Sequence, residues 1–265
     1  MIDTALDFYA VPRDELQKHI GDAEASGRGA DGVSVSQALK HFVRDWTDEG
    51  NHERAAPFAC LQRTLDMLFP ERHAAADKVK ILLPGAGLGF QVTINEWSMF
   101  MNVAYRYVQR HGLKDGLTFH PFVDGWSHHA SDSKMQRQLP FPDVDKGVKR
   151  QSVFESMALD ISICHVHKHG PLVDGTIKMV LKPGGYWINL GPLLYGTAPF
   201  VQLSLQDIVK VAEAIEFEFM ETSDECGTPT FANSTVRSIE AIYGFDKEAL
   251  TKNSYNAQFW VAKKS

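Results

Sequence analysis

The stretch that decides the fold is Ile81-Leu82-Leu83-Pro84-Gly85-Ala86-Gly87-Leu88-Gly89, an apolar run that ends in three alternating glycines. An apolar run of this kind is typical of a strand buried in a parallel sheet. Glycines directly after such a strand let the backbone turn sharply and bring main-chain N–H groups close to a ligand. The pattern therefore predicts Gly85, Gly87 and Gly89 as residues of a cofactor-binding turn, although such a turn can also be purely structural.

An acidic residue at the end of the following strand usually accepts hydrogen bonds from ribose hydroxyl groups. Glu96 follows a second extended run, residues 91–94, and is predicted to bind the cofactor in this way; alternatively, it begins a helix at Trp97. However, Glu96 is only eleven residues after Gly85, whereas a crossover between parallel strands needs a dozen or more. The segment after Gly89 is therefore too short for the usual connecting helix.

Hydrophobic periodicity indicates the order of the other elements. Alternating strands and helices follow two or three initial helices, which predicts an α/β fold with a mostly parallel sheet. We expect a helical extension over residues 1–72 and one α/β domain over residues 73–265. Helices are predicted at residues 37–47, 53–68, 98–109, 173–180 and 205–216, and extended segments at residues 78–83, 91–94, 117–123, 159–164, 186–190 and 257–262.

Composition limits the possible partners and compartments. The net charge of −6 and the pI of about 6.0 argue against binding to nucleic acid or to an anionic membrane. No apolar run is long enough for a membrane span, and the start of the sequence does not resemble a signal peptide. Cys60, Cys164 and Cys226 are widely spaced and odd in number, which predicts reduced thiols rather than a disulfide framework or a zinc site. We therefore expect a cytoplasmic location, and a nuclear location is also compatible with the sequence.

His165, His167 and His169 alternate in the way that would place three metal ligands on one face of a strand. No pattern of cysteines or carboxylates supports them, so a loop with incidental histidines is the favoured interpretation, and we expect no metal.

Five segments together resemble the carnosine N-methyltransferase family, and they occur in the family's order. The similarity covers roughly residues 37–262. The late helix–KPGG–strand unit is also common in class I S-adenosylmethionine-dependent methyltransferases. The five segments are residues 42–50 (FVRDWTDEG, followed by Glu53-Arg54), 83–89 (LPGAGLG), 95–101 (NEWSMFM), 141–145 (FPDVD) and 181–195 (LKPGGYWINLGPLLY).

This resemblance implies a Rossmann-like class I sheet, S-adenosyl-L-methionine as the cofactor, and methyl transfer to an imidazole nitrogen of carnosine or a related dipeptide, giving anserine from carnosine. Arg44 matches a family arginine that reaches the methionine carboxylate of the cofactor, and His41 stands where the family often has a glutamine. Tyr255 matches a family tyrosine near the substrate. Arg44 could instead pair with Asp48 one helical turn on, and Tyr255 could be a core or rim residue. A homodimer is compatible with the sequence, which does not fix the oligomeric state.

The chain also departs from the family pattern. The helix after the glycine turn has no room, and no G-D-F segment follows Asp145. His165 stands in place of a substrate-binding aspartate, so we assign it to the substrate although it brings no negative charge. Gly196 replaces a substrate-binding histidine. We therefore expect weak cofactor binding and slow or absent methylation of carnosine. Two alternatives remain: methylation of another imidazole or peptide acceptor, and a non-catalytic role in binding or regulation.

Overall fold

The computed structural model of this chain describes residues 3, 6–7, 10–27, 39–44, 47–71, 81–84, 93–95, 103, 107, 116–123, 128–141, 159–164, 175, 177–193, 203–243 and 246–265. Residues 39–44 are helical. The other helices are α2 (Arg13–Ala25), α4 (Asn51–Leu68), α6 (Asp132–Met135), α7 (Ile177–Val180), α8 (Leu205–Ala214) and the 3₁₀ turn η3 (Asp224–Cys226). The strands are β1 (Ile81–Pro84), β2 (Thr93–Asn95), β3 (Leu117–Phe119), β4 (Leu139–Phe141), β5 (Leu159–Cys164), β6 (Leu181–Gly191), β7 (Phe217–Phe219), β8 (Thr228–Pro229), β9 (Arg237–Ile242) and β10 (Ser254–Lys264).

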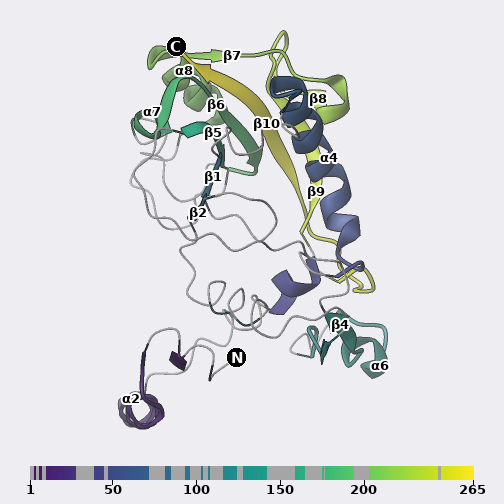
Figure 1. The fold of residues 1–265 in the computed structure, drawn as a ribbon. Helices are drawn as coiled ribbons and strands as arrows, with labels where there is room; N and C mark the ends of the chain where they lie inside the picture. The colour runs from purple at the N-terminus through teal and green to yellow at the C-terminus, as the bar shows by residue number, and fades with distance from the viewer. Residues whose placement is uncertain are drawn as a thin grey trace.

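Eight of the described strands form one mixed sheet (Figure 1). Their order is β2-β1-β5-β6-β10-β9-β8, and β7 pairs with β10. The pairs among β2, β1, β5 and β6 are parallel, whereas all pairs made by β10 and β9 are antiparallel. The prediction that the four apolar segments near β1, β2, β5 and β6 share one sheet is confirmed. The expected α/β class holds, but the sheet is mixed rather than mostly parallel.

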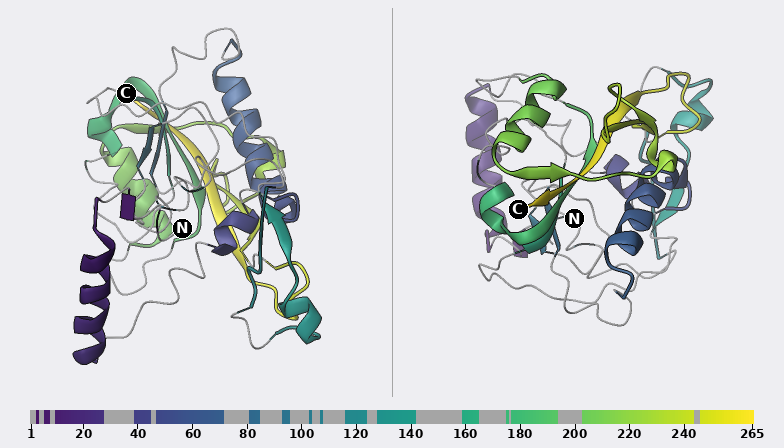
Figure 2. Two further views of the ribbon diagram at one scale, coloured as in Figure 1. Left: turned by 60° about the horizontal axis from the view of Figure 1, so that its bottom comes forward. Right: turned by 90° about the horizontal axis from the view of Figure 1, so that it is seen from above.

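Helices cover both faces of this sheet. Seen from above, α8 lies on one face and α4 on the other (Figure 2). The strand pleat explains this arrangement, because neighbouring side chains of β6 point to opposite faces. Trp187 packs with Ile208 of α8, whereas Ile188 packs with Leu65 of α4. By contrast, α2 buries none of its side chains.

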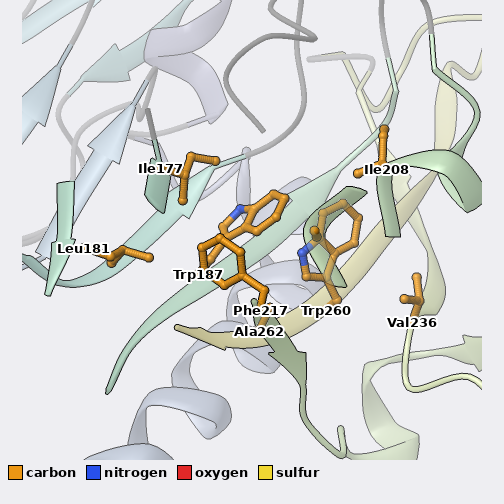
Figure 3. Close-up of a cluster of buried hydrophobic side chains, with 9 residues drawn as sticks. Ile177, Leu181, Trp187, Ile208, Phe217, Val236, Trp260 and Ala262 are labelled. Atoms are coloured by element: carbon orange, nitrogen blue, oxygen red, sulfur yellow. The ribbon is translucent and has the colours of Figure 1, made fainter. Parts of the chain in front are cut away.

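Two tryptophans form the centre of the core on the α8 face. Trp187 of β6 and Trp260 of β10 are fully buried, and their rings meet edge to face at 5.2 Å (Figure 3). Phe217 contacts Trp187 at 5.6 Å, and Ile208 and Ala212 of α8 close the cluster. Aromatic pairs in this geometry are stabilised beyond the area that they bury, so β6 and β10 form the rigid centre of the sheet.

The KPGG segment, residues 182–185, differs from its predicted structure. The sequence predicts it as the connection between a helix at residues 173–180 and a strand at residues 186–190. Helix α7 does end before it, but the segment lies within β6, where the pairing with β5 shifts between Leu181 and Tyr186. The extra residues form an irregularity in the ladder, with Gly184 at a φ of +74° that glycine adopts without strain.

Two of the three cysteines form a disulfide. Cys60 of α4 and Cys226 of η3 are bonded, with their Cα atoms 5.3 Å apart, and both are buried. The prediction of reduced thiols is therefore wrong for this pair. A separation of 166 residues gives no local spacing pattern, and only the packing of α4 on the sheet brings the two positions together.

Candidate functional site

Aromatic packing fixes the helical segment 39–44 that carries two of the predicted cofactor residues. Phe42 stacks on Phe141 of β4 with ring centres 4.8 Å apart, and Phe119 of β3 meets both rings. Val43 is fully buried in the cluster that contains Phe122. Because these two neighbours point inward, the adjacent residues of the segment are left half-buried at its edge.

A close turn holds the backbone of Arg44. The Thr47 hydroxyl donates a hydrogen bond to the carbonyl oxygen of Val43 at 2.7 Å, and Gly50 N–H donates to that hydroxyl at 3.3 Å. The Arg54 guanidinium donates to the carbonyl oxygen of Thr47 at 2.9 Å and also to that of Arg44. Gly50 is so close that an added Cβ would lie 2.5 Å from the Arg44 Cα. The position of Arg44 therefore depends on this glycine.

Tyr243 brings three predicted site residues together. Its half-buried ring meets the His41 ring edge-on at 6.3 Å, and the Arg44 guanidinium carbon lies 5.9 Å from its centre. The Tyr255 ring lies 5.7 Å away on the paired strand β10. Tyr243 N–H donates a 2.9 Å hydrogen bond to the carbonyl oxygen of Asn253, which fixes it at the turn of the β9–β10 hairpin.

Gly85, Gly87, Gly89, Glu96 and His165 lie outside the described residues, as do His167 and His169. Of the predicted helix at 98–109, only Val103 and Tyr107 are described, and both are helical. The strands that precede Gly85, Glu96 and His165 are described. Pro84 and Asn95, the last residues of β1 and β2, are direct partners in the parallel ladder. Cys164, the last residue of β5, pairs with Asn189 of β6. The strands that lead into Gly85, Glu96 and His165 thus share one sheet and run in one direction.

A buried ionic cluster, which no sequence pattern indicated, lies beside the Tyr243 group. Arg137 forms ion pairs with Glu49 and, at 2.7 Å, with Asp246, and its guanidinium stacks 4.2 Å from the centre of the Phe122 ring. His129 Nε2 lies 2.8 Å from an Asp246 carboxylate oxygen. The side chains of Arg137, Asp246 and His129 are 14%, 5% and 10% exposed.

The charges of this cluster stabilise one another. Burial alone would lower the pKa of the Arg137 guanidinium, but its hydrogen bond to Asp246 and the charge of Glu49 raise that pKa above its usual value. Burial alone would raise the pKa of Asp246, but hydrogen bonds from Arg137, the Glu248 N–H and His129 lower it below its usual value. Both shifts favour the ionised pair.

Within the described part of the chain, no group of three or more histidine, cysteine or acidic residues is placed to hold a metal ion. None of the described helices is long and apolar enough to cross a membrane.

A protein-family model with the description "Carnosine N-methyltransferase" matches residues 24–168 and 175–265. The carnosine N-methyltransferase of Schizosaccharomyces pombe is 28% identical over 275 residues, which cover 86% of this chain and 70% of that protein. The proteins of that name from Rattus norvegicus and Mus musculus are each 30% identical over 243 residues, which cover 79% of this chain and 60% of theirs.

Proposed function

This chain belongs to the carnosine N-methyltransferase family, and we propose on that basis that it transfers a methyl group from S-adenosyl-L-methionine to the histidine imidazole of carnosine or a related dipeptide. The family is one of methyltransferases, and the relatives carry the name of the carnosine enzyme. The chain spans only 60% to 70% of those relatives, so its acceptor, donor and turnover belong to the proposal.

The observation that carries this proposal is the meeting of Arg44, His41 and Tyr255 around Tyr243. Arg44 and His41 are the residues assigned to the cofactor, and Tyr255 is the residue assigned to the substrate. They come from a helical segment and a strand more than 200 residues apart in sequence. A donor site and an acceptor site must adjoin for methyl transfer, and this cluster supports such a junction.

The residues of the Tyr243 cluster are suited to bind the methionine part of S-adenosyl-L-methionine. The Arg44 guanidinium is half-buried, and its planar fork matches a carboxylate with two parallel hydrogen bonds. The proposal also includes a Rossmann-like class I sheet, which the parallel order β2-β1-β5-β6 followed by antiparallel β10 supports. In that arrangement the glycine turn after β1 and Glu96 after β2 bind the nucleoside.

S-adenosyl-L-methionine supplies an activated methyl group when it is bound, so the protein mainly orients the acceptor. An imidazole nitrogen must be neutral to accept the methyl group, and with a pKa of about 6.5 much of the acceptor is neutral at pH 7. Tyr255 and His165 would hold the acceptor by hydrogen bonds to its other polar atoms. Correct orientation then supplies most of the rate.

We expect this chain to turn over more slowly than family members with the full pattern, because the segment after Gly89 lacks room for a helix. Such a helix would supply N-terminal backbone donors to the cofactor. His165 also replaces a carboxylate that would fix the acceptor tautomer. These two departures from the family pattern favour the alternative of a non-catalytic binding protein. They do not affect the meeting of Arg44, His41 and Tyr255 around Tyr243.

Calorimetry with S-adenosylhomocysteine and radiolabelled methyl transfer to carnosine test the proposal together. Arg44→Ala should weaken binding of the product at least tenfold, the usual consequence of losing a charge-assisted hydrogen bond. Arg63→Ala is the matched control, because Arg63 is a half-exposed arginine of α4 paired with Glu225. Binding without transfer to carnosine would indicate another acceptor or a non-catalytic role. Absence of both binding and transfer would overturn the proposal, whereas turnover of about 1 s⁻¹ would show that the departures from the family pattern are unimportant.

A further inference from the structure

Arg137 links two turns that flank the proposed site. One of its partners, Glu49, belongs to the turn that follows the helical segment 39–44. The other, Asp246, lies in the turn after β9, three residues beyond Tyr243. Arg137 itself precedes β4, so one side chain connects three segments that are far apart in sequence.

We propose that Arg137 is a positioning residue, which fixes the distance between the cofactor-side segment with Arg44 and the substrate-side hairpin with Tyr243 and Tyr255. The proposal rests on the function proposed above for what these two sides bind. Among the described residues, Arg137 pairs with Glu49, Asp246 and Glu248 and stacks on Phe122, so it acts on Arg44 and Tyr255 through its neighbours.

The contacts around Arg137 connect it to both sides of the site. Glu49 precedes Gly50, the residue packed against the Arg44 backbone. Phe122, on which the guanidinium lies, belongs to the cluster with Val43 and Tyr243. A displacement of the guanidinium would therefore be passed to Arg44 through the turn and to Tyr243 through the cluster.

The charges of the cluster show why an arginine is required. The carboxylates of Glu49 and Asp246 are 13% and 5% exposed, and Arg137 is the one cation within the described residues that pairs with both. Lys247 pairs with Glu49 at 3.9 Å, and His129 pairs with Asp246. Both ion pairs are made by Nη2 of Arg137, while the planar guanidinium lies on the Phe122 ring. A lysine at position 137 would keep the charge but would lack the planar group that stacks on this ring.

Arg237 offers a matched control within the same fold. Its side chain is 8% exposed, and it donates to the Thr222 hydroxyl at 2.8 Å and to the Thr222 carbonyl at 2.9 Å. It also pairs with Asp224 at 2.7 Å and donates to the Gly227 carbonyl oxygen at 3.1 Å. Within the described part of the chain, these partners lie outside the Tyr243 cluster. Removing this arginine should disturb the protein to a comparable extent without changing the site.

Hydrogen exchange of single amides tests the proposal without any need for activity. Thr47 N–H, which donates to Val43, reports on the cofactor side, and Tyr243 N–H, which donates to Asn253, reports on the hairpin. Thr230 N–H, which donates to Val236, reports on the region of Arg237. In Arg137→Met, exchange at Thr47 and Tyr243 should accelerate at least tenfold relative to Thr230, and Arg237→Met should show the reverse.

Arg137→Lys provides a kinetic test, which still applies if the Arg137→Met variant fails to fold. Its affinity for S-adenosylhomocysteine should stay within about threefold of wild type, while kcat for carnosine falls roughly ten- to a hundredfold, as expected for a small misplacement of bound groups. Equal exchange at the three amides in Arg137→Met, or wild-type kcat in Arg137→Lys, would overturn the positioning role. If the variants show the expected exchange pattern but the wild-type protein binds no product, only the proposed function is refuted.

Discussion

Replacing Gly50 with alanine should displace Arg44. The new Cβ would lie 2.5 Å from both the Cα and the carbonyl oxygen of Arg44, which are backbone atoms without rotational freedom. Ordinary contacts of this kind need about 3.4 Å or more, so the turn and the helical segment must separate by roughly 1 Å. That movement would also strain the hydrogen bonds that Arg54 donates to the carbonyl groups of Arg44 and Thr47.

The cost of this change can be bounded. Inserting a methyl group into a packed site typically costs about 1–3 kcal/mol, and weakening a hydrogen bond from a charged donor adds roughly 1 kcal/mol or more. We therefore expect the free energy of unfolding to fall by about 2–4 kcal/mol. For 265 residues each kcal/mol lowers the Tm by about 2 °C, which gives a drop of roughly 4–8 °C.

Thermal unfolding and calorimetry with S-adenosylhomocysteine measure the two consequences separately. If Arg44 binds the carboxylate, its displacement should weaken product binding by roughly 10- to 100-fold. Gly21→Ala in α2 is the control, because a Cβ there meets nothing within 4 Å. It should leave product affinity unchanged and should not lower the Tm, since alanine favours a helix interior more than glycine does.

A Tm within about 1 °C of wild type in Gly50→Ala would refute the packing argument. A lowered Tm with unchanged product affinity would leave the packing intact but would contradict the role of Arg44.

Three further predictions concern stability. Reduction of the Cys60–Cys226 disulfide, which closes a loop of 166 residues, should lower the free energy of unfolding by up to about 5 kcal/mol in urea titrations; three reactive thiols in the unreduced, denatured protein would contradict it. Because the pKa of Asp246 is lowered in the fold, its contribution is present above the unfolded pKa and is lost as the pH falls below about 4. Asp246→Asn should therefore flatten the acid limb of the stability–pH curve, and an unchanged limb would count against the ion pair. Ser204 accepts a hydrogen bond from Asp207 N–H at the start of α8, so Ser204→Ala should cost about 1 kcal/mol by calorimetry, whereas Ser204→Asp should not.

The apolar strands were predictable because each is a short run of large side chains, and β5 has the predicted bounds of residues 159–164. Helix α8 was predictable from the helical spacing of its apolar residues, and the serine before it, Ser204, is a residue type that commonly caps helices. The strand β9 was missed because its sequence, RSIEAI, contains two charged residues. One of them, Arg237, is buried in the fold, where its guanidinium donates a hydrogen bond to the Thr222 hydroxyl and pairs with Asp224.

In the candidate site, too, some residues could be predicted from the sequence and others depend on contacts between distant segments. His41, Arg44 and Tyr255 were identified from a family pattern, but the residue that joins them, Tyr243, was not. Tyr243 contacts all three residues because the β9–β10 hairpin places it there, and no local sequence pattern predicts this hairpin. Arg137 was missed because its partners lie 88 and 109 residues away along the chain, and such long-range ion pairs leave no periodic trace.

The place of β10 in the sheet has a consequence for biosynthesis. This strand lies between β6 and β9, yet it follows every other described strand in sequence (Figure 1). About 60 residues separate β6 from β10, so at roughly 5–20 residues per second a ribosome needs several seconds to deliver the missing neighbour. Until then β6 presents an open ladder with Trp187 and Ile188 unburied, which can pair with another nascent chain. Losses during expression should therefore occur on polysomes, where nascent chains are crowded, and codon choice after β6 should affect yield more than the same changes before β1.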